Sequence, residues 1–279
     1  MYDDSPAWRV MFNMLEAMYH CHPVRIDIAG TVESIAEINA DLLYKCYETF
    51  YNPANMFICI VGNVNADKTL KQIESSIITK KPVALARGEF NELHSIVKNY
   101  VEQKLAVSMP MFCLGFKQKI ATPYRRLKSK VCVNMLLEII CGDASPLYAR
   151  LMNEGLINDE FDCEYFNGNG YAAVIFEGES CDPERVSNEI KAEINRLRAE
   201  GIDKKLFSAV KCGMYGSAVR KFNSVESLAM KLTECAVFDY NLFDEIKLLK
   251  TVSYDDVLKR LDVFCDENAV LSVINPLED

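Results

Sequence analysis

The chain of 279 residues carries 40 acidic and 31 basic residues, a formal net charge of −9, and half of its residues are hydrophobic. This length and composition allow a sizeable core and predict about two globular units. The acidic balance without a basic block argues against nucleic-acid binding. The apolar runs are too short or interrupted to span a bilayer and the acidic start is unlike a signal peptide, so we expect no membrane association and a cytoplasmic location.

The first third of the chain predicts helices and one apolar strand. The helices are expected at 8–20, 33–38, 41–51 and 66–77. Asn39 can cap the third of these helices, and Asn52-Pro53 stops it. The run "MFICIVG" at 56–62 is continuously apolar and of strand length, so it predicts a strand.

Residues 81–97 lose periodicity and contain Pro82 and Gly88, so they predict a linker. An apolar strand region at 105–117 follows the linker. Further helices are expected at 124–141, 146–153, 183–200, 203–220 and 224–237. Two strands, 160–166 and 171–178, are predicted to pair around the turn "NGNG".

The end of the chain repeats an earlier pattern. Residues 253–275 can be laid over 39–62, so that cap, helix, Phe, turn, Asn and strand recur in the same order. Ser253 then falls on Asn39 and Phe264 falls on Phe50. The helix at 224–237 similarly falls on the helix at 8–20. The order of elements favours a duplicated domain.

The spacing of the copies, about a full domain length, sets the expected domain organisation. We predict that residues 1–80 are the C-terminal part of a truncated domain, 81–97 a linker, and 98–279 a complete domain. The fold class is expected to be α+β, with an antiparallel or mixed sheet covered by helices. A partial domain exposes a sheet edge and apolar surface, so we expect self-association or a partner chain.

Five stretches stand out together: "MYDDSPAWR", "HPVRIDIAGTVESIAEI", "CYETFYNPANMFICIVGNV", "LGFK" and "SPLYARLMNEGL". With them the sequence resembles the insulinase, pitrilysin and mitochondrial processing peptidase superfamily, the inverzincins, and especially its bacterial zinc-protease-like members. The resemblance implies tandem α+β domains, or partner chains, that close over a peptide substrate. Active members hold zinc with an HxxEH helix, in which two His bind the metal and the Glu acts as general base, and with a second Glu downstream.

Neither HxxEH nor HExxH occurs in this sequence. By the resemblance, the downstream Glu would lie just before "MYDD". Many members also carry an Arg followed seven residues later by a Tyr; here Met152 and Asn158 fall near those places, and Arg150 lies two positions early. We therefore expect no catalytic, cofactor-binding or metal-ligating residue and no cofactor in this chain.

Two hypotheses about function remain open. The first is a non-catalytic portion or truncated paralogue of a zinc metalloendopeptidase, which contributes chamber wall or partner binding to peptide cleavage and is inactive alone. The second is an independent enzyme that uses a metal cluster of Glu16, His20 and His22, or a cysteine nucleophile. The eleven cysteines contain no CxxC pair, which fits reduced, buried thiols. The sequence favours the first hypothesis, and we interpret the His-Cys-His triplet at residues 20–22 as a turn.

Overall fold

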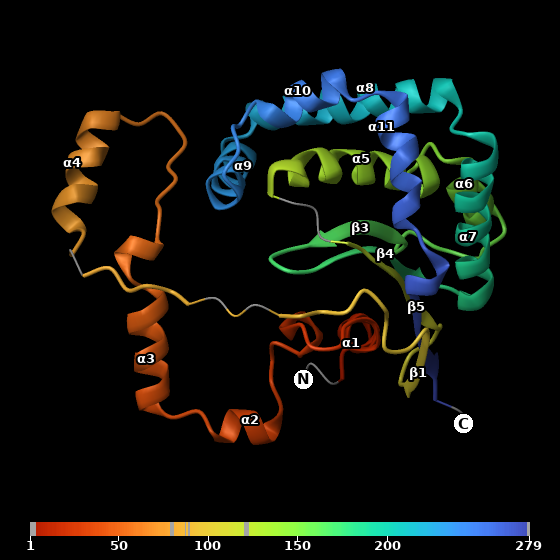
Figure 1. The fold of residues 1–279 in the computed structure, drawn as a ribbon, viewed down its shortest axis with the longest axis horizontal. Helices are drawn as coiled ribbons and strands as arrows, with labels where there is room; N and C mark the ends of the chain where they lie inside the picture. Colours follow the sequence, from red (N-terminus) through yellow and green to blue (C-terminus); the bar gives the residue numbers. More distant parts are fainter. Residues whose placement is uncertain (1–3, 79–80, 87, 89, 120–122, 278–279) are drawn as a thin grey trace. The chain divides into compact units, whose positions relative to one another are not determined.

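The computed structural model describes residues 4–78, 81–86, 88, 90–119 and 123–277 (Figure 1). These residues belong to two compact units. The first unit comprises residues 1–29, 90–216 and 245–279, and the second comprises 30–89 and 217–244. The predicted boundaries at 80/81 and 97/98 follow from the repeat in the sequence, do not coincide with the limits of these units, and stay a prediction.

The first unit is built on a five-stranded sheet with the order β1-β5-β2-β4-β3. The strands are β1 (Tyr100–Leu105), β2 (Met111–Lys117), β3 (Asp162–Asn167), β4 (Ala172–Glu179) and β5 (Ala269–Pro276). β1 pairs with β5 in parallel, and the other neighbours are antiparallel. The α+β class and the β3–β4 hairpin are thus confirmed, and the sheet is mixed at one edge. The single strand region expected at 105–117 is two strands: β1, with the sequence YVEQKL, lacks an apolar run, and its residues alternate between exposed and partly buried.

Helices cover both faces of this sheet (Figure 1). They are α1 (Pro6–Met18), α5 (Pro123–Cys141), α6 (Pro146–Asn153), α7 (Pro183–Glu200), most of α8 (Lys204–Arg220), most of α10 (Asp244–Thr251) and α11 (Tyr254–Leu258). α1 packs on β5, β2 and β1, whereas α5 and α7 pack on the opposite face. Among the described residues no single helix is long and apolar enough to cross a membrane. The helix pair formed by α5 and α6, bent by 41°, meets the same criteria, but only by length and composition.

The apolar sequence of β2 follows from burial on both faces. Cys113 and Gly115 face α1, while Phe116 faces the other way and meets Phe264, with ring centroids 5.4 Å apart. A Cβ atom at Gly115 would lie 2.5 Å from the terminal methyl of Met18. Glycine at this position therefore lets α1 approach the sheet closely.

The second unit is formed by helices with strong local signals. They are α2 (Val32–Ala36), α3 (Ala40–Phe50), α4 (Ala66–Ser76) and α9 (Val225–Phe238). The N-cap side chains of Asn39 and Asn65 accept hydrogen bonds from the backbone N–H groups of Leu42 and Lys68. These bonds satisfy donors that the helix start leaves free.

The two copies of the predicted repeat share a capped helix and a later 3₁₀ turn in the structure, but not the strand; the helix of the first copy, α3, has 11 residues, and α11 of the second has 5 and continues as a 3₁₀ helix at Lys259–Val263. Ser253 caps α11 through the Asp256 N–H in the same way that Asn39 caps α3. Short 3₁₀ turns follow at 53–55 and 266–268. The strand predicted at 56–62 is wrong, because this segment is extended but forms no ladder with any described residue. Its apolar sequence favours a strand, and a strand exists only with a neighbour.

The two copies of the repeat place equivalent phenylalanines in different surroundings, which gives a matched pair for measurement. Phe264 is fully buried against Phe116 and Phe176, whereas Phe50 is 55% exposed. Phe264→Ala should lower the free energy of unfolding by about 3–5 kcal/mol because it leaves a cavity. Phe50→Ala should change it by less than about 0.5 kcal/mol. Urea denaturation followed by circular dichroism measures both, and equal losses would contradict the difference in burial.

Candidate functional site

The chain leaves α1 in a tight turn that holds two of its three histidines, His20 and His22. Tyr19 ends the helix with extended backbone. Pro23 then starts a one-turn 3₁₀ helix at Pro23–Arg25, and His22 caps it because its Nδ1 accepts the Val24 N–H at 3.1 Å. A proline is suited to the first position of such a turn because it has no N–H to satisfy. The "HCHP" sequence therefore encodes the turn locally.

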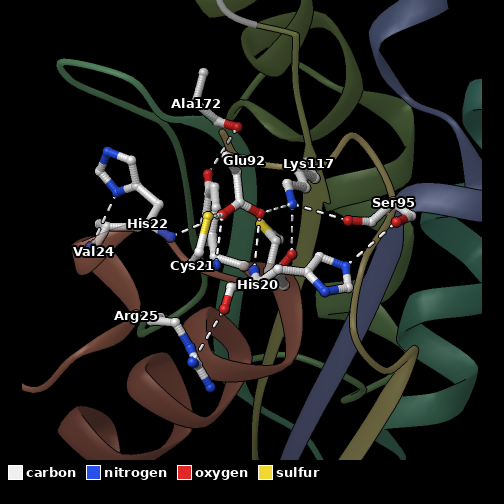
Figure 2. Close-up of polar contacts among 11 residues, drawn as sticks. His20, Cys21, His22, Val24, Arg25, Glu92, Ser95, Lys117 and Ala172 are labelled. Atoms are coloured by element: carbon white, nitrogen blue, oxygen red, sulfur yellow. Dashed lines mark hydrogen bonds and ion pairs between the residues drawn. The ribbon is translucent and has the colours of Figure 1, made fainter. Parts of the chain in front are cut away.

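Glu92 binds the outside of this turn (Figure 2). Its carboxylate accepts the backbone N–H groups of His20, Cys21 and His22, at 2.9, 2.8 and 2.8 Å. The same carboxylate forms an ion pair with Lys117, with Nζ to Oε1 at 2.6 Å. The Glu92 and Lys117 side chains are only 7% and 4% exposed. One buried carboxylate thus holds three consecutive amides and one ammonium.

Lys117, at the end of β2, uses its remaining hydrogen-bonding capacity on the backbone. Its Nζ donates to the carbonyl oxygens of Met18 and Ser95, each at 2.9 Å. The ammonium also lies 4.7 Å from the centroid of the Tyr19 ring. An ammonium has three protons, and here all three have acceptors, so the buried charge is fully satisfied.

The environment of Glu92 strongly favours its ionised form. Burial alone would raise the pKa of Glu92, but the hydrogen bonds from Lys117 and from the three backbone N–H groups outweigh it. The pKa of this carboxyl is therefore held well below its usual range. The negative charge is a permanent part of the folded structure near neutral pH.

His22 is a buried structural residue in this turn. Its ring lies against the rings of Phe90 and Tyr171, with centroid distances of 5.1 and 5.2 Å. Because Nδ1 accepts from Val24, the ring proton is assigned to Nε2, which lies 3.1 Å from the Asn169 carbonyl oxygen. Both ring nitrogens are therefore engaged by the backbone.

The residues of the alternative metal cluster are not brought together. Glu16 is exposed on α1, and His20 Nε2 lies 3.3 Å from the Ser95 hydroxyl. Within the described ranges no three His, Cys, Asp or Glu side chains are grouped so that they could hold a metal ion. Since His22 offers no free nitrogen, these residues do not fit the zinc that the resemblance implies for active members.

The cysteines are all free thiols. Burial raises the pKa of the Cys113 and Cys141 thiols well above the usual range, and that of Cys163 to about 12. Cys21, beside the two histidines, is an exposed residue, but desolvation of its thiol and the hydrogen bond of the thiol to the Glu92 carboxylate also raise its pKa. A cysteine nucleophile needs a lowered pKa, so these four thiols are poor candidates.

Two of the residues compared with the family's Arg and Tyr, Arg150 and Asn158, bind carboxylates of this chain. Arg150 on α6 forms an ion pair with Glu189 at 2.6 Å, and Asn158 donates to Glu179 at 2.8 Å. Met152 lies on the same helix as Arg150. None of the three contacts the His20–His22 turn in the interactions described above.

Sequence reasoning missed the two residues that organise this turn. Glu92 lies inside the predicted linker, and nothing in its local sequence marks it as buried. Lys117 had a weak signal, since a lysine at the end of the apolar run "MFCLGFK" must find a partner if the strand is buried. The partner itself, 25 residues earlier in the chain, is visible only in three dimensions.

The Glu92–Lys117 pair predicts a pH-dependent loss of stability. Glu92→Gln leaves Lys117 buried without a counter-charge and should lower the free energy of unfolding at pH 7 by about 3–5 kcal/mol. The unfolded carboxyl titrates near pH 4.3 and the folded one lower, so the contribution of Glu92 is complete above about pH 4.3. It is lost as the pH falls through the folded pKa, and the difference between wild type and variant should therefore shrink on acidification.

Urea denaturation at pH 7 and at about pH 3 measures this difference. Glu16→Gln, on an exposed position of α1, is the matched control and should have an effect below about 0.5 kcal/mol. The double variant Glu92→Gln/Lys117→Met should recover part of the loss, because no unpaired charge is left. A loss that is constant from pH 7 to 3 would contradict this account.

Comparison with known proteins agrees with the fold and with the sequence motifs. Residues 37–214 match the Peptidase M16 inactive domain. The uncharacterised zinc protease YmfH of Bacillus subtilis is 35% identical over 265 residues, which cover 92% of this chain and 61% of YmfH. A second such protein of that organism, YmxG, is 24% identical over 266 residues and is covered to 61%. The chain spans about three fifths of the length of these relatives.

Solved structures show the same fold. An M16-like peptidase from Alicyclobacillus acidocaldarius aligns with a TM-score of 0.93 at 27% identity, over 99% of this chain and 67% of that one. A protease from Helicobacter pylori aligns with a TM-score of 0.86 at 17% identity, over 99% of this chain and 68% of that one. The match over residues 37–214 and the identity with YmfH confirm the resemblance, and the chain belongs to the M16 peptidase family, in which it matches the inactive domain.

Proposed function

We propose that this chain is the non-catalytic portion of an M16-type zinc metalloendopeptidase. In this role it forms part of the wall of the chamber that holds the peptide substrate, and another polypeptide segment supplies the zinc and the general base. The observation that carries the proposal is the match of residues 37–214 to the inactive domain of this family. The relatives' description as zinc proteases supports the substrate class, a peptide.

The geometry of the His20–His22 turn supports the same proposal. The turn carries both histidines of the alternative metal cluster, His20 and His22. Its contacts hold the turn together: the Glu92 carboxylate accepts hydrogen bonds from its backbone N–H groups, and both ring nitrogens of His22 contact backbone groups. The sequence offers no HxxEH motif as a substitute. Zinc chemistry in the assembled enzyme would then come from elsewhere.

The independent-enzyme hypothesis has no contact in its favour among the residues described. We also propose a cytoplasmic location, because eleven free thiols fit a reducing compartment. Self-association remains the alternative to a catalytic partner chain. The metal analysis below separates the proposed function from the independent enzyme.

The proposal predicts that zinc and peptidase activity do not reside in this chain. The purified, untagged chain should contain less than about 0.1 zinc per molecule and cleave no quenched fluorescent peptide, since a zinc site needs three or four converging ligands. Co-expression with a polypeptide that carries an HxxEH helix should yield zinc and cleavage that a chelator abolishes. Inductively coupled plasma mass spectrometry and the peptide assay measure the two quantities.

The histidine variants provide the matched controls for this experiment. His20→Ala should leave zinc content and partner-dependent cleavage unchanged, and His22→Ala should cost about 1–3 kcal/mol of stability through its lost buried hydrogen bonds. One tightly bound zinc per chain that disappears in His20→Ala would overturn the proposal in favour of the independent enzyme. So would cleavage by the chain alone.

A further inference from the structure

The tip of the β3–β4 hairpin carries the dipeptide Asn-Gly twice in succession, at residues 167–168 and 169–170 (Figure 1). No other asparagine of the sequence precedes a glycine. An asparagine before a glycine readily closes to a succinimide, because glycine has no side chain that shields its backbone nitrogen from the asparagine side chain. The contacts of the two dipeptides differ, and so should their reactivity.

Both reacting groups of the first dipeptide are engaged in hydrogen bonds. The Asn167 side-chain amide donates to the Tyr165 carbonyl oxygen, with Nδ2 to O at 2.9 Å. The Gly168 N–H donates to the Tyr171 carbonyl oxygen at 3.0 Å. A Cβ atom at Gly168 would lie 2.4 Å from the Tyr171 ring, so this ring packs closely against the glycine. Attack by the Gly168 nitrogen on the Asn167 side chain would have to break both hydrogen bonds.

The second dipeptide is more open and lies against His22. Asn169 is exposed, and neither its side-chain amide nor the Gly170 N–H forms a hydrogen bond with any residue that the structure describes. Gly170 has φ +89°, and a Cβ atom there would lie 2.9 Å from His22 Nε2. Only glycine suits this backbone conformation and this close approach. The reacting groups are therefore free, and one histidine ring adjoins them.

His22 contacts the peptide unit that would react. Its Nε2, which carries the ring proton, lies 3.1 Å from the Asn169 carbonyl oxygen. This carbonyl and the Gly170 nitrogen form one peptide bond, so a negative charge on the deprotonated nitrogen is shared with the oxygen by resonance. An N–H group directed at that oxygen stabilises the charge where it develops. The hydrogen bond from His22 should therefore make the Gly170 nitrogen easier to deprotonate.

We propose that Asn169-Gly170 is a site of self-modification, at which the chain forms a succinimide and His22 promotes the reaction. The Gly170 nitrogen gives its proton to a solvent base and attacks the Asn169 side-chain carbon Cγ. The N–Cγ bond forms, the Cγ–Nδ2 bond breaks, and ammonia leaves with a proton from water. The inference does not depend on the proposed function.

Water then opens the succinimide ring at either of its two carbonyl groups. Attack at Cγ gives aspartate, whereas attack at the former Asn169 main-chain carbonyl gives an isoaspartyl residue, whose backbone is longer by one methylene. In the isoaspartyl product the group that His22 contacts has become a carboxylate. Each product replaces a neutral amide by a negative charge at the hairpin tip.

The two dipeptides in one molecule provide the first test. The purified full chain is incubated at mildly alkaline pH, and ammonia loss at each asparagine is followed by peptide mass spectrometry with electron-transfer fragmentation, after digestion at acidic pH. Asn169 should convert at least about tenfold faster than Asn167, as expected from hydrogen bonds that engage one site and activate the other. In a synthetic peptide of residues 162–179 the two rates should be similar, because the contacts with His22 are absent.

Variants of the two asparagines identify the site independently. Asn169→Gln should abolish the fast conversion, since a glutamine side chain would have to close a larger ring. Asn167→Gln is the matched control and should leave the fast conversion unchanged. Fast conversion that persists in Asn169→Gln would overturn the proposed site.

Variants of His22 test its part in the reaction. His22→Phe keeps an aromatic ring beside Phe90 and Tyr171 but removes the donor, and it should slow conversion at Asn169 about tenfold, the effect of one hydrogen bond. His22→Gln can still donate from its side-chain amide and should retain most of the rate. Circular dichroism checks that both variants fold. If His22→Phe does not fold, the comparison of Asn169 with Asn167 in the wild-type chain and in the peptide still decides the proposal.

A purely structural role of His22 predicts the opposite sign. A loosened hairpin would react faster at both asparagines, so faster conversion in His22→Phe would overturn the proposed role of His22. Equal slowing in His22→Phe and His22→Gln would assign the effect to the lost Val24 contact and would also overturn it. Equal rates at Asn167 and Asn169 in the folded chain, or the same preference for Asn169 in the peptide, would overturn the proposal as a whole.

Discussion

The buried ion pair between Glu92 and Lys117 is the constraint on which the arrangement of the first unit depends. Through it, the exit of α1, the end of β2 and the segment around residue 92 are held at one point. Removing two charges from water is costly, and this cost is offset only where every donor and acceptor finds a partner. Here the ammonium has three acceptors and the carboxylate has four N–H donors, so the condition is met.

This constraint helps to place α1. The helix comes from the first copy of the repeat, but it belongs to the first unit and packs on β5, which comes from the second copy. The pair fixes the chain just beyond α1, and Gly115 leaves room for Met14 and Met18 against the sheet. Apolar contacts then supply the stabilisation, while the ion pair specifies where the helix ends. Apolar packing is tolerant of small shifts, whereas a fully hydrogen-bonded charge pair has one geometry.

The elements that could be predicted from the sequence are those with local causes. Most helices follow from periodicity and from caps such as Asn39 and Ser253, and the β3–β4 hairpin follows from its turn. The interpretation of "HCHP" as a turn also rested on local chemistry, and the structure agrees. Glu92 could not be found in this way, because a carboxylate within a stretch without periodicity has no local feature that marks its burial.

The segment 56–62 also shows what local sequence cannot predict: it has a clear strand signal, but it forms no strand. Its sequence predicts a strand as strongly as that of β5, and the two segments even follow equivalent caps and 3₁₀ turns. β5 is a strand because β1 and β2 lie on its edges, and 56–62 has no such neighbours among the described residues. Helices satisfy their backbone within one segment, but strands satisfy theirs only through other segments. A repeat can therefore conserve the strand's sequence in both copies while only the copy with neighbours forms it.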